Sequence, residues 1–228
     1  MSFLGKYPPQ SISELVFATA AVRTEIEQYA LGQKTEHLLL HGPPGSGKSI
    51  AAKMIVNTQM PNLKGTPFAS PIHGRTDAEC LSKIEAQRNF QSASGYHQLH
   101  LIIDELDMLT LSTRNALRNQ IDNEWTRTTL ICTTNYAHKL EHALLSRFNK
   151  LEVPLPTLSQ WRPRIETILA AEGCPVPSSD MDSDLSNKAM DARDVGRMIQ
   201  NVVNANNATK LAEIAAHQSA ASIQASTP

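Results

Sequence analysis

Aromatic residues and unbalanced charge are both scarce in this chain of 228 residues. Only 5% of its residues are Phe, Trp or Tyr, and its formal net charge is −1. Proteins that bind single-stranded nucleic acid stack the bases on aromatic side chains, and DNA attracts strongly basic surfaces. The composition therefore argues against a stacking platform and against a basic surface over the whole molecule. Any contact with nucleic acid must come from a local patch.

Cysteine and long apolar runs are scarce as well. Cys80, Cys132 and Cys174 lie far apart in the sequence, so they match neither a disulfide framework nor a zinc site. No run approaches the eighteen apolar residues that a membrane-spanning helix needs. The first seven residues contain one lysine and no apolar run typical of a signal peptide. We therefore expect a soluble cytoplasmic protein from a reducing compartment.

Predicted strands and helices alternate over the first two thirds of the chain, which has 41% hydrophobic residues overall. The predicted strands are 38–41, 67–72, 99–103, 128–133 and 150–153. The predicted helices are 13–32, with a break near Thr19, then 48–59, 77–93, 110–124 and 144–148. This alternation is typical of an α/β fold in which helices cover both faces of a parallel sheet.

The pattern changes at residues 154–158, where "PLPT" ends the last predicted strand. Only helical segments follow, at 159–172, near 184–188, at 192–204 and at about 205–218. We therefore predict an α/β core over residues 1–154, a small all-α domain over 155–218 and a flexible tail over 219–228.

The stretch "GPPGSGKS" follows the first predicted strand and matches the phosphate-binding pattern G-x-x-x-x-G-K-[ST]. Its residues are Gly42, Pro43, Pro44, Gly45, Ser46, Gly47, Lys48 and Ser49. Glycines allow the backbone amides to turn inward around a phosphate. Lys48 supplies a positive charge for the terminal phosphates, and Ser49 supplies a hydroxyl for Mg²⁺. The alternative interpretation is a glycine-rich turn without a ligand, but a strand before it and a helix after it favour phosphate binding.

The predicted strand in "HLIIDEL" ends in two acidic residues, Asp104 and Glu105. Adjacent carboxylates at the end of a buried strand are costly unless a cation or another partner is present. We predict that Asp104 holds Mg²⁺, directly or through water, and that Glu105 orients and deprotonates an attacking water molecule. The alternative is a strand that simply ends in solvent, where acidic residues are common.

Three further polar residues suit a hydrolytic site. Asn135 follows the strand in "LICTTNY" and would reach a phosphate or the attacking water, whereas the alternative is a turn-forming asparagine. Arg147 precedes the last predicted strand, and Arg193 lies in the first turn of a predicted helix, where a cation opposes the helix dipole. An anion opposite Arg193 would explain its position. The alternative for each arginine is a surface ion pair, for example with Asp194 or Glu141.

The order of these motifs resembles the AAA+ ATPases, and within them most closely the clamp-loader small subunits of the replication factor C type. The resemblance covers about residues 4–210. The matching stretches are "GKYPPQSISELVF", "HLLLHGPPGSGKS", "IIDELDMLTLSTRNALRNQID" and "TLICTTNYAHKLEHALLSRF". It implies ATP and Mg²⁺ as ligands, and a five-stranded parallel sheet with strand order 5-1-4-3-2 followed by a helical lid.

The resemblance also implies residue roles. Residues 42–49 would be the Walker A motif, Asp104 and Glu105 the Walker B motif, and Asn135 the first sensor. Arg147 would be an arginine finger that reaches the ATP of a neighbouring subunit, in a ring or spiral formed by self-association. Arg193 would be the second sensor on the lid.

The opening segment also fits the resemblance, and the chain departs from the family pattern at three points. Tyr7 and Pro8 would lie near the adenine base, although the family has arginine where Pro8 stands. The family also has cysteine where Phe148 stands. We expect no counterpart of the C-terminal collar domain of clamp-loader subunits, because the helical lid is the last domain that the sequence predicts.

Three functions remain open at this point. The first is an ATP-driven DNA-replication accessory factor, with Arg114, Arg118, Arg75 and Lys83 as candidate DNA contacts; the alternative for these residues is a solvated helix face, with Arg118 paired to Asp122. The second is a motor or activator that remodels a protein client. The third is a slow ATP-dependent assembly switch. We expect no membrane partner.

Overall fold

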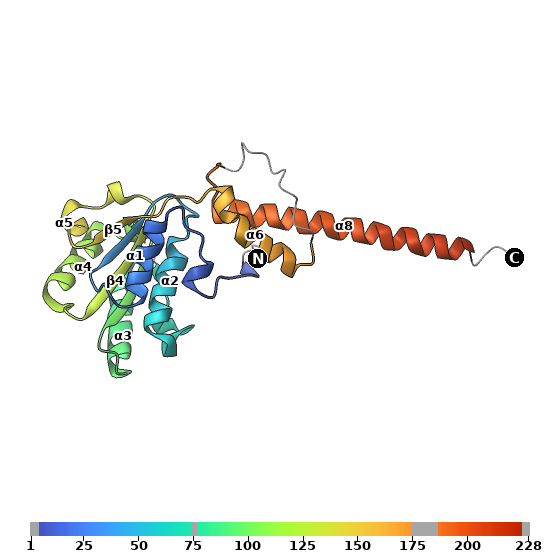
Figure 1. Ribbon diagram of the computed structural model, residues 1–228. Coiled ribbons are helices and arrows are strands. Elements are labelled where there is room, and N and C mark those ends of the chain that lie inside the picture. Colours follow the sequence, from blue (N-terminus) through green and yellow to red (C-terminus); the bar gives the residue numbers. More distant parts are fainter. Residues whose placement is uncertain (1–4, 74–76, 175–186, 225–228) are drawn as a thin grey trace. The chain divides into compact units, whose positions relative to one another are not determined.

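The computed structural model describes residues 5–73, 77–174 and 187–224. The chain forms two compact units (Figure 1). One unit spans Pro9–Pro156, and the other begins at Thr157 and includes the N-terminal segment through Pro8.

The first unit is built on a five-stranded parallel sheet with the strand order β2-β3-β4-β1-β5. Its strands are β1 (Leu38–His41), β2 (Ile72–His73), β3 (Leu99–Asp104), β4 (Thr128–Thr134) and β5 (Asn149–Glu152). In register, Leu38 of the central strand β1 pairs with Ile131 of β4 on one side and with Asn149 of β5 on the other. The predicted fold class and strand order are confirmed.

Helices cover both faces of this sheet (Figure 1). The α-helices are α1 (Ala20–Ala30), α2 (Lys48–Gln59), α3 (Asp77–Ala93), α4 (Leu111–Glu124) and α5 (His142–Leu145). Short 3-10 helices are η2 (Ile12–Glu14), η3 (Pro61–Leu63), η4 (Pro67–Ala69), η5 (Leu106–Met108) and η6 (Ala137–Lys139). Because side chains alternate along a strand, Leu38 and Leu40 pack with α1 and α2, while Leu39 packs with α3, α4 and α5.

Side-chain caps begin the helices α1 and α4. The Thr19 hydroxyl accepts a hydrogen bond from the Val22 amide at α1, and the Thr110 hydroxyl accepts one from the Thr113 amide at α4. Each cap satisfies a backbone amide that has no partner within its own helix. The predicted break near Thr19 is therefore an N-cap, with the short helix η2 before it.

The segment 67–72 is not the continuous strand that the sequence predicts. Residues Pro67–Ala69 form η4, and β2 contains only Ile72 and His73. Pro67 and Pro71 have no amide hydrogen to donate to a neighbouring strand, so the extended pairing begins only after Pro71. The strand is real but shorter than predicted.

The second unit is helical and contains α6 (Leu158–Ala171) and α8 (Ala192–Gln224). Thr157 and Gln160 form a capping box at the start of α6, and Trp161 Nε1 donates to the Met190 carbonyl. Within the same unit, the Tyr7 hydroxyl donates to Glu172. The predicted short helix near 184–188 lies largely outside the described residues.

Helix α8 is one continuous element where the sequence predicts two helices, 192–204 and 205–218. The asparagine-rich stretch in between has weak helix propensity, but it contains neither proline nor glycine, and propensity is only a weak determinant. The helix continues through Gln224, into the predicted tail 219–228. Residues 225–228 lie outside the part of the chain that the structure describes.

A buried histidine in the sheet gives a pH-dependent stability. His100 of β3 is 3% exposed, and its Nδ1 has no hydrogen-bond partner among the described residues. Burial lowers its pKa to about 4. Because the unfolded chain binds this proton near pH 6.5, stability falls as the pH drops from 6.5 through 4, by up to about 1.4 kcal/mol per pH unit.

We therefore expect His100→Leu to lose less stability than the wild type between pH 6.5 and pH 4, as measured by urea unfolding. The exposed His97 provides the matched control, and His97→Leu should keep the wild-type pH dependence. Identical pH profiles for His100→Leu and the wild type would contradict this prediction.

Candidate nucleotide-binding site

The loop between β1 and α2 has a backbone that only glycine adopts readily. Gly42, Gly45 and Gly47 have φ angles of 142°, 78° and 91°, which other residues rarely adopt. At Gly42, an added Cβ atom would lie 2.4 Å from the Val153 carbonyl oxygen. Glycine is therefore required at Gly42 for two reasons, backbone conformation and close packing against the chain after β5.

The Lys48 ammonium group lies inside this loop. The residue is 6% exposed, and Nζ donates to the carbonyls of Gly42 at 2.9 Å and Pro43 at 2.7 Å, and to Ser46 Oγ at 3.3 Å. Burial lowers the pKa of Lys48 to about 8. A buried cation whose closest partners are neutral oxygens is poorly compensated. An anionic group in the loop would compensate it, and successive loop amides suit the same anion.

A hydroxyl and a carboxylate meet beside the start of α2. Ser49 Oγ donates to Asp104 Oδ1 at 2.6 Å, and Thr133 Oγ1 donates to the same oxygen. The other carboxylate oxygen lies 3.7 Å from Nδ1 of His73. Oxygen donors of this kind suit a hard cation such as Mg²⁺, which usually takes one or two protein ligands and completes its shell with phosphate and water. Ser49 and Asp104 therefore fit the predicted metal site.

Glu105 follows Asp104 in a strained conformation. Its φ of 60° is the only positive value of a non-glycine residue in the ranges that the structure describes. The Glu105 amide donates to Thr133 Oγ1 at 3.1 Å, and its carbonyl accepts from the Met108 amide at 2.9 Å. Strain of this kind concentrates at functional sites and persists where surrounding contacts hold it. These contacts fix the backbone from which the Glu105 carboxylate extends.

Asn135 follows β4 at the same edge of the sheet. His41, the last residue of β1, pairs with Thr134, so Asn135 and Gly42 are both the next residue after this pair. Since β3 is also parallel to β4, Asp104 and Glu105 leave the sheet at this edge too. The structure therefore brings the predicted loop, the two acidic residues and Asn135 to one carboxyl-terminal edge, where ligands bind in open α/β sheets.

The hydroxyl groups of Thr133 and Thr134 hold the acidic segment in place, and the sequence did not predict this role. Thr133 donates to Asp104 and accepts from the Glu105 amide, and Thr134 Oγ1 donates to Asp107 Oδ1 at 2.6 Å. The signal in the sequence is the polar pair that ends an otherwise apolar strand immediately before Asn135.

Arg147 forms a bidentate ion pair with Asp122 of α4. Its Nε and Nη2 atoms lie 2.9 and 2.7 Å from the two carboxylate oxygens of Asp122. The hydrogen bonds raise the pKa of Arg147 and lower that of Asp122. Asp122 is therefore the partner of Arg147, and neither Asp194 nor Glu141 is.

The remaining predicted ligands belong to the helical unit. Arg193 is exposed in the first turn of α8, and Asp194 pairs with Arg197. The Tyr7 carbonyl accepts a hydrogen bond from Arg164 at 3.0 Å. Pro8 is the last residue of the N-terminal segment that this unit contains. The roles of Tyr7, Pro8 and Arg193 stay predictions.

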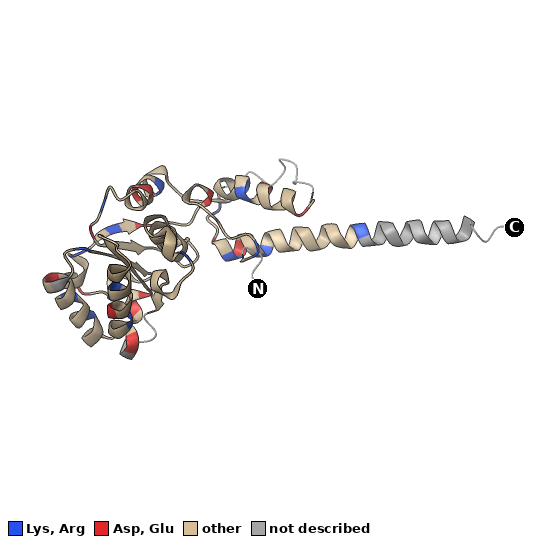
Figure 2. Cartoon of the chain, turned by 90° about the horizontal axis from the view of Figure 1, so that it is seen from below, with Lys and Arg blue, Asp and Glu red and all other residues tan. Residues whose placement is uncertain are grey.

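Two of the candidate DNA contacts form ion pairs within the chain. Arg114 binds Glu141 through two hydrogen bonds, and its role as a DNA contact stays a prediction. Lys83 pairs with Glu79 on α3, and Arg75 lies outside the described residues. Arg118 is half-buried on α4. Basic residues are interspersed with acidic ones in Figure 2.

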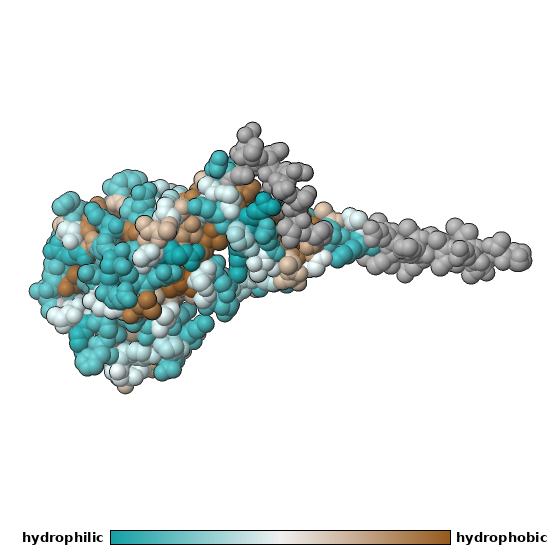
Figure 3. Space-filling view, in the orientation of Figure 1, coloured by the Kyte–Doolittle hydropathy of each residue, from teal (hydrophilic) through white to brown (hydrophobic). Residues whose placement is uncertain are grey.

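The described residues contain no group of three His, Cys, Asp or Glu side chains arranged to hold a metal ion. A divalent ion at Ser49 and Asp104 would therefore need the oxygens of a bound phosphate. The described residues also contain no helix with the length and hydrophobicity to cross a bilayer. In Figure 3, hydrophobic patches alternate with hydrophilic ones on the visible face of the α/β unit.

The fold and the loop together define the class of P-loop nucleotide-binding domains. The family model "ATPase family associated with various cellular activities (AAA)" matches residues 38–155, slightly more than half of the chain. The chain therefore belongs to the AAA family of ATPases, as the resemblance implies.

Curated relatives support the more specific likeness. Replication factor C subunit 3 of Saccharomyces cerevisiae is 33% identical over 178 residues, which are 75% of this chain and 51% of the relative. Replication factor C subunit 5 of Homo sapiens is 27% identical over 190 residues, covering 79% of this chain and 54% of the relative. The chain thus spans about half the length of these relatives. The predicted likeness to replication factor C subunits is confirmed.

Solved structures show the same fold. A mutant form of RuvB from Thermotoga maritima superposes with a TM-score of 0.56 at 19% sequence identity, covering 73% of this chain and 55% of that chain. A second mutant form of the same protein gives a TM-score of 0.55 at 20% identity, with the same coverage.

The close packing at Gly42 gives a test of the loop. We expect Gly42→Ala to lower the free energy of unfolding by at least about 2 kcal/mol more than Gly95→Ala, because both suffer backbone strain but only Gly42 meets another backbone group. Gly95 has a φ of 84° and no atom within 4 Å of an added Cβ, so it is the matched control. Chemical denaturation of both variants measures the difference, and equal losses would contradict the prediction.

Proposed function

We propose that this chain is an ATP-hydrolysing module that depends on Mg²⁺ and acts in an oligomer, as a DNA-replication accessory factor of the clamp-loader type. The observation that carries the proposal is the buried Lys48 ammonium inside a glycine-rich loop, next to the Ser49–Asp104 pair. The replication role rests on relatives that are named replication factor C subunits.

The loop residues 42–49 would bind the phosphates of ATP through their amides, and Lys48 would exchange its carbonyl partners for phosphate oxygens. Ser49 and Asp104 would hold Mg²⁺. Bound there, the ion neutralises charge on the phosphate oxygens. Tyr7 and Pro8 would lie near the adenine base.

Glu105 would accept a proton from the attacking water, since the residue follows β3 at the same edge of the sheet as the phosphate loop. Its backbone is held by Thr133 and Met108, which reduces the motion that would displace the carboxylate. Asn135, at the same edge, would orient the water or a terminal phosphate oxygen.

Arg147 would complete the site of a neighbouring protomer. Its pair with Asp122 is partly exposed, at 31% for the arginine side chain, so a phosphate can compete for the guanidinium at low cost. Arg193 would contact phosphate from the helical unit, which we propose is the lid formed by residues 155–218. Closure of the lid would then depend on bound nucleotide.

Two variants distinguish the loss of the Arg147 guanidinium from the loss of its ion pair with Asp122. We expect Arg147→Ala to lower the ATPase rate of the assembled protein by about 10³-fold or more, because a finger supplied in trans stabilises charge in the transition state. Asp122→Asn breaks the same ion pair but keeps the guanidinium, so its rate should equal or exceed that of the wild type.

ATPase rates measured across a protein concentration series, with the oligomer followed by mass photometry, check both expectations. The wild-type rate per protomer should rise as the oligomer forms. A constant rate per protomer, or equal losses in Arg147→Ala and Asp122→Asn, would contradict the proposed role of Arg147.

A further inference from the structure

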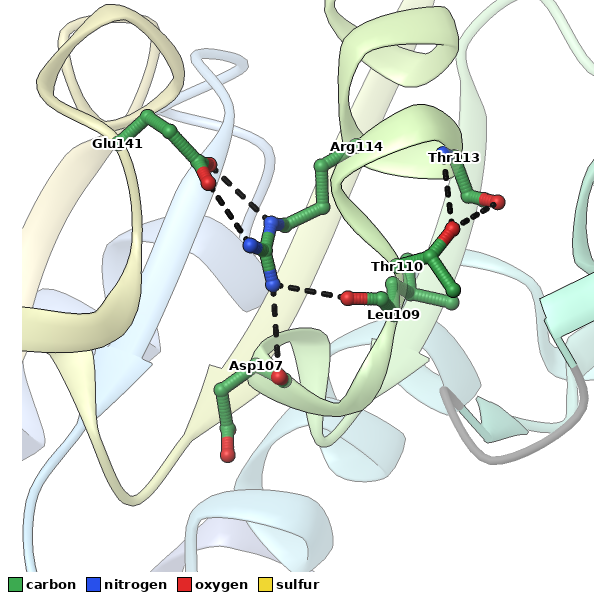
Figure 4. Close-up of polar contacts among 6 residues, drawn as sticks. All are labelled: Asp107, Leu109, Thr110, Thr113, Arg114 and Glu141. Atoms are coloured by element: carbon green, nitrogen blue, oxygen red, sulfur yellow. Dashed lines mark hydrogen bonds and ion pairs between the residues drawn. The ribbon is translucent and has the colours of Figure 1, made fainter.

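Arg114 is a buried arginine that lies outside the nucleotide site. It lies in the first turn of α4, and its side chain is 12% exposed. Nε and Nη2 donate to the two carboxylate oxygens of Glu141 at 3.1 and 2.7 Å, while Nη1 donates to the Leu109 carbonyl at 2.8 Å and to the Asp107 carbonyl at 3.4 Å (Figure 4).

These contacts join two chain segments. The carbonyls of Asp107 and Leu109 belong to the η5 turn, which begins immediately after Glu105. The Met108 amide of this turn donates a hydrogen bond to the Glu105 carbonyl. Glu141 is the N-cap residue of α5, and Arg147 follows that short helix. One guanidinium therefore connects the segment of Glu105 to the segment of Arg147.

The start of α4 does not depend on Arg114. Thr110 caps that helix by accepting a hydrogen bond from the Thr113 amide at 3.3 Å (Figure 4). Asp107 is held a second time, by the Thr134 hydroxyl. Because these contacts persist without the guanidinium, loss of Arg114 should loosen the link between the two segments more than it destabilises the helix.

The geometry needs arginine. A planar guanidinium offers five N–H groups in a fixed arrangement, so it can bind a carboxylate with two hydrogen bonds and still reach carbonyls on its other side. A lysine ammonium is a point charge and cannot hold both segments in the same orientation.

Helix α4 holds the α5 segment at two points of different strength. The side chain of Arg114 is 12% exposed and that of Arg147 is 31% exposed, while their partners Glu141 and Asp122 are similarly exposed at 35% and 39%. The contact of the more buried arginine suits a permanent link, and that of the more exposed arginine suits an exchangeable one. Release of Arg147 toward a neighbour would therefore leave the rest of α5 attached to the η5 turn.

We propose that Arg114 is a positioning residue that couples the catalytic carboxylate of one ATP site to the arginine that the same protomer supplies to the next site. It contacts Glu141 and the η5 carbonyls and acts through them. This inference rests on the proposed function, because it assumes the roles of Glu105 and Arg147.

The first experiment measures steady-state ATPase kinetics of the assembled full chain. We expect Arg114→Gln and Glu141→Gln each to lower kcat at least tenfold with KM for Mg-ATP within twofold, since neither residue contacts the nucleotide loop. The double variant should lose no more than the larger single loss, because both changes remove one interaction. The kcat of Arg114→Lys should stay as low as that of Arg114→Gln, because an ammonium cannot bind both segments.

The matched control is the exposed ion pair between Arg162 and Glu166 on α6. Arg162→Gln and Glu166→Gln should keep the wild-type kcat. Thermal melts of every variant show that it is folded, and Glu141→Gln, which keeps the shape of the side chain, supplies the test if Arg114→Gln does not fold.

The second experiment mixes two kinds of protomer. Glu105→Gln protomers supply Arg147 to a neighbour but lack the carboxylate, and Arg147→Ala protomers have the carboxylate but need a neighbour's arginine. Mixing them should restore activity. Adding Arg114→Gln to either kind should then lower the restored rate at least fivefold, because Arg114 positions both groups.

Several results would overturn the inference. They are a wild-type kcat in Arg114→Gln or Glu141→Gln, a parallel loss of kcat and nucleotide affinity, or a loss in only one arm of the mixing experiment. A wild-type chain that neither hydrolyses ATP nor assembles would instead overturn the proposed function, so the two failures are distinguishable.

Discussion

The site depends on the confinement of one lysine ammonium inside a glycine-rich turn. Lys48 is buried against the carbonyls of Gly42 and Pro43, and burial lowers its pKa to about 8. The turn can enclose the ammonium because its glycines adopt positive φ angles and because Gly42 leaves room for the Val153 carbonyl. A phosphate that enters the turn interacts with an ammonium that is already removed from water, so little further reorganisation of the protein is needed.

The parallel sheet supplies the rest of the constellation. Strands β1, β3 and β4 end at one edge, so residues distant in sequence leave the sheet together. Thr133 then links Asp104 to the strained backbone of Glu105. Thr133 of β4 therefore holds both the Asp104 carboxylate and the Glu105 backbone, which offsets part of the cost of placing acidic residues at the end of a buried strand.

Local patterns in the sequence predicted the sheet and the residues at its edge, whereas the strand order was implied by the resemblance to the AAA+ ATPases. Glycine spacing, apolar strands and acidic strand ends are short-range signals, and each has a direct structural cause. The strand at Ile72 was predicted too long because the prediction did not consider that Pro67 and Pro71 lack an amide hydrogen to donate to a neighbouring strand. Helix α8 was predicted as two helices, although the stretch between them contains no proline or glycine that would end a helix.

Contacts between side chains from different elements were harder to predict. Arg114 and Glu141 are 27 residues apart, and Arg147 and Asp122 are 25 apart. Helix α4 carries several charged residues on adjoining turns, and the sequence does not specify which of them faces α5. Arg114 was therefore a candidate DNA contact with a solvated helix face as the alternative, and neither prediction included its ion pair with Glu141.

The most direct test of the account is the affinity of the chain for Mg²⁺ and a non-hydrolysable ATP analogue, measured by isothermal titration calorimetry in Lys48→Met and in the exposed control Lys64→Met. The account predicts that Lys48→Met weakens binding by about 10- to 100-fold, the loss of one charge-assisted interaction, while Lys64→Met binds like the wild type. Equal affinities in Lys48→Met and the wild type would contradict the central role of the buried ammonium.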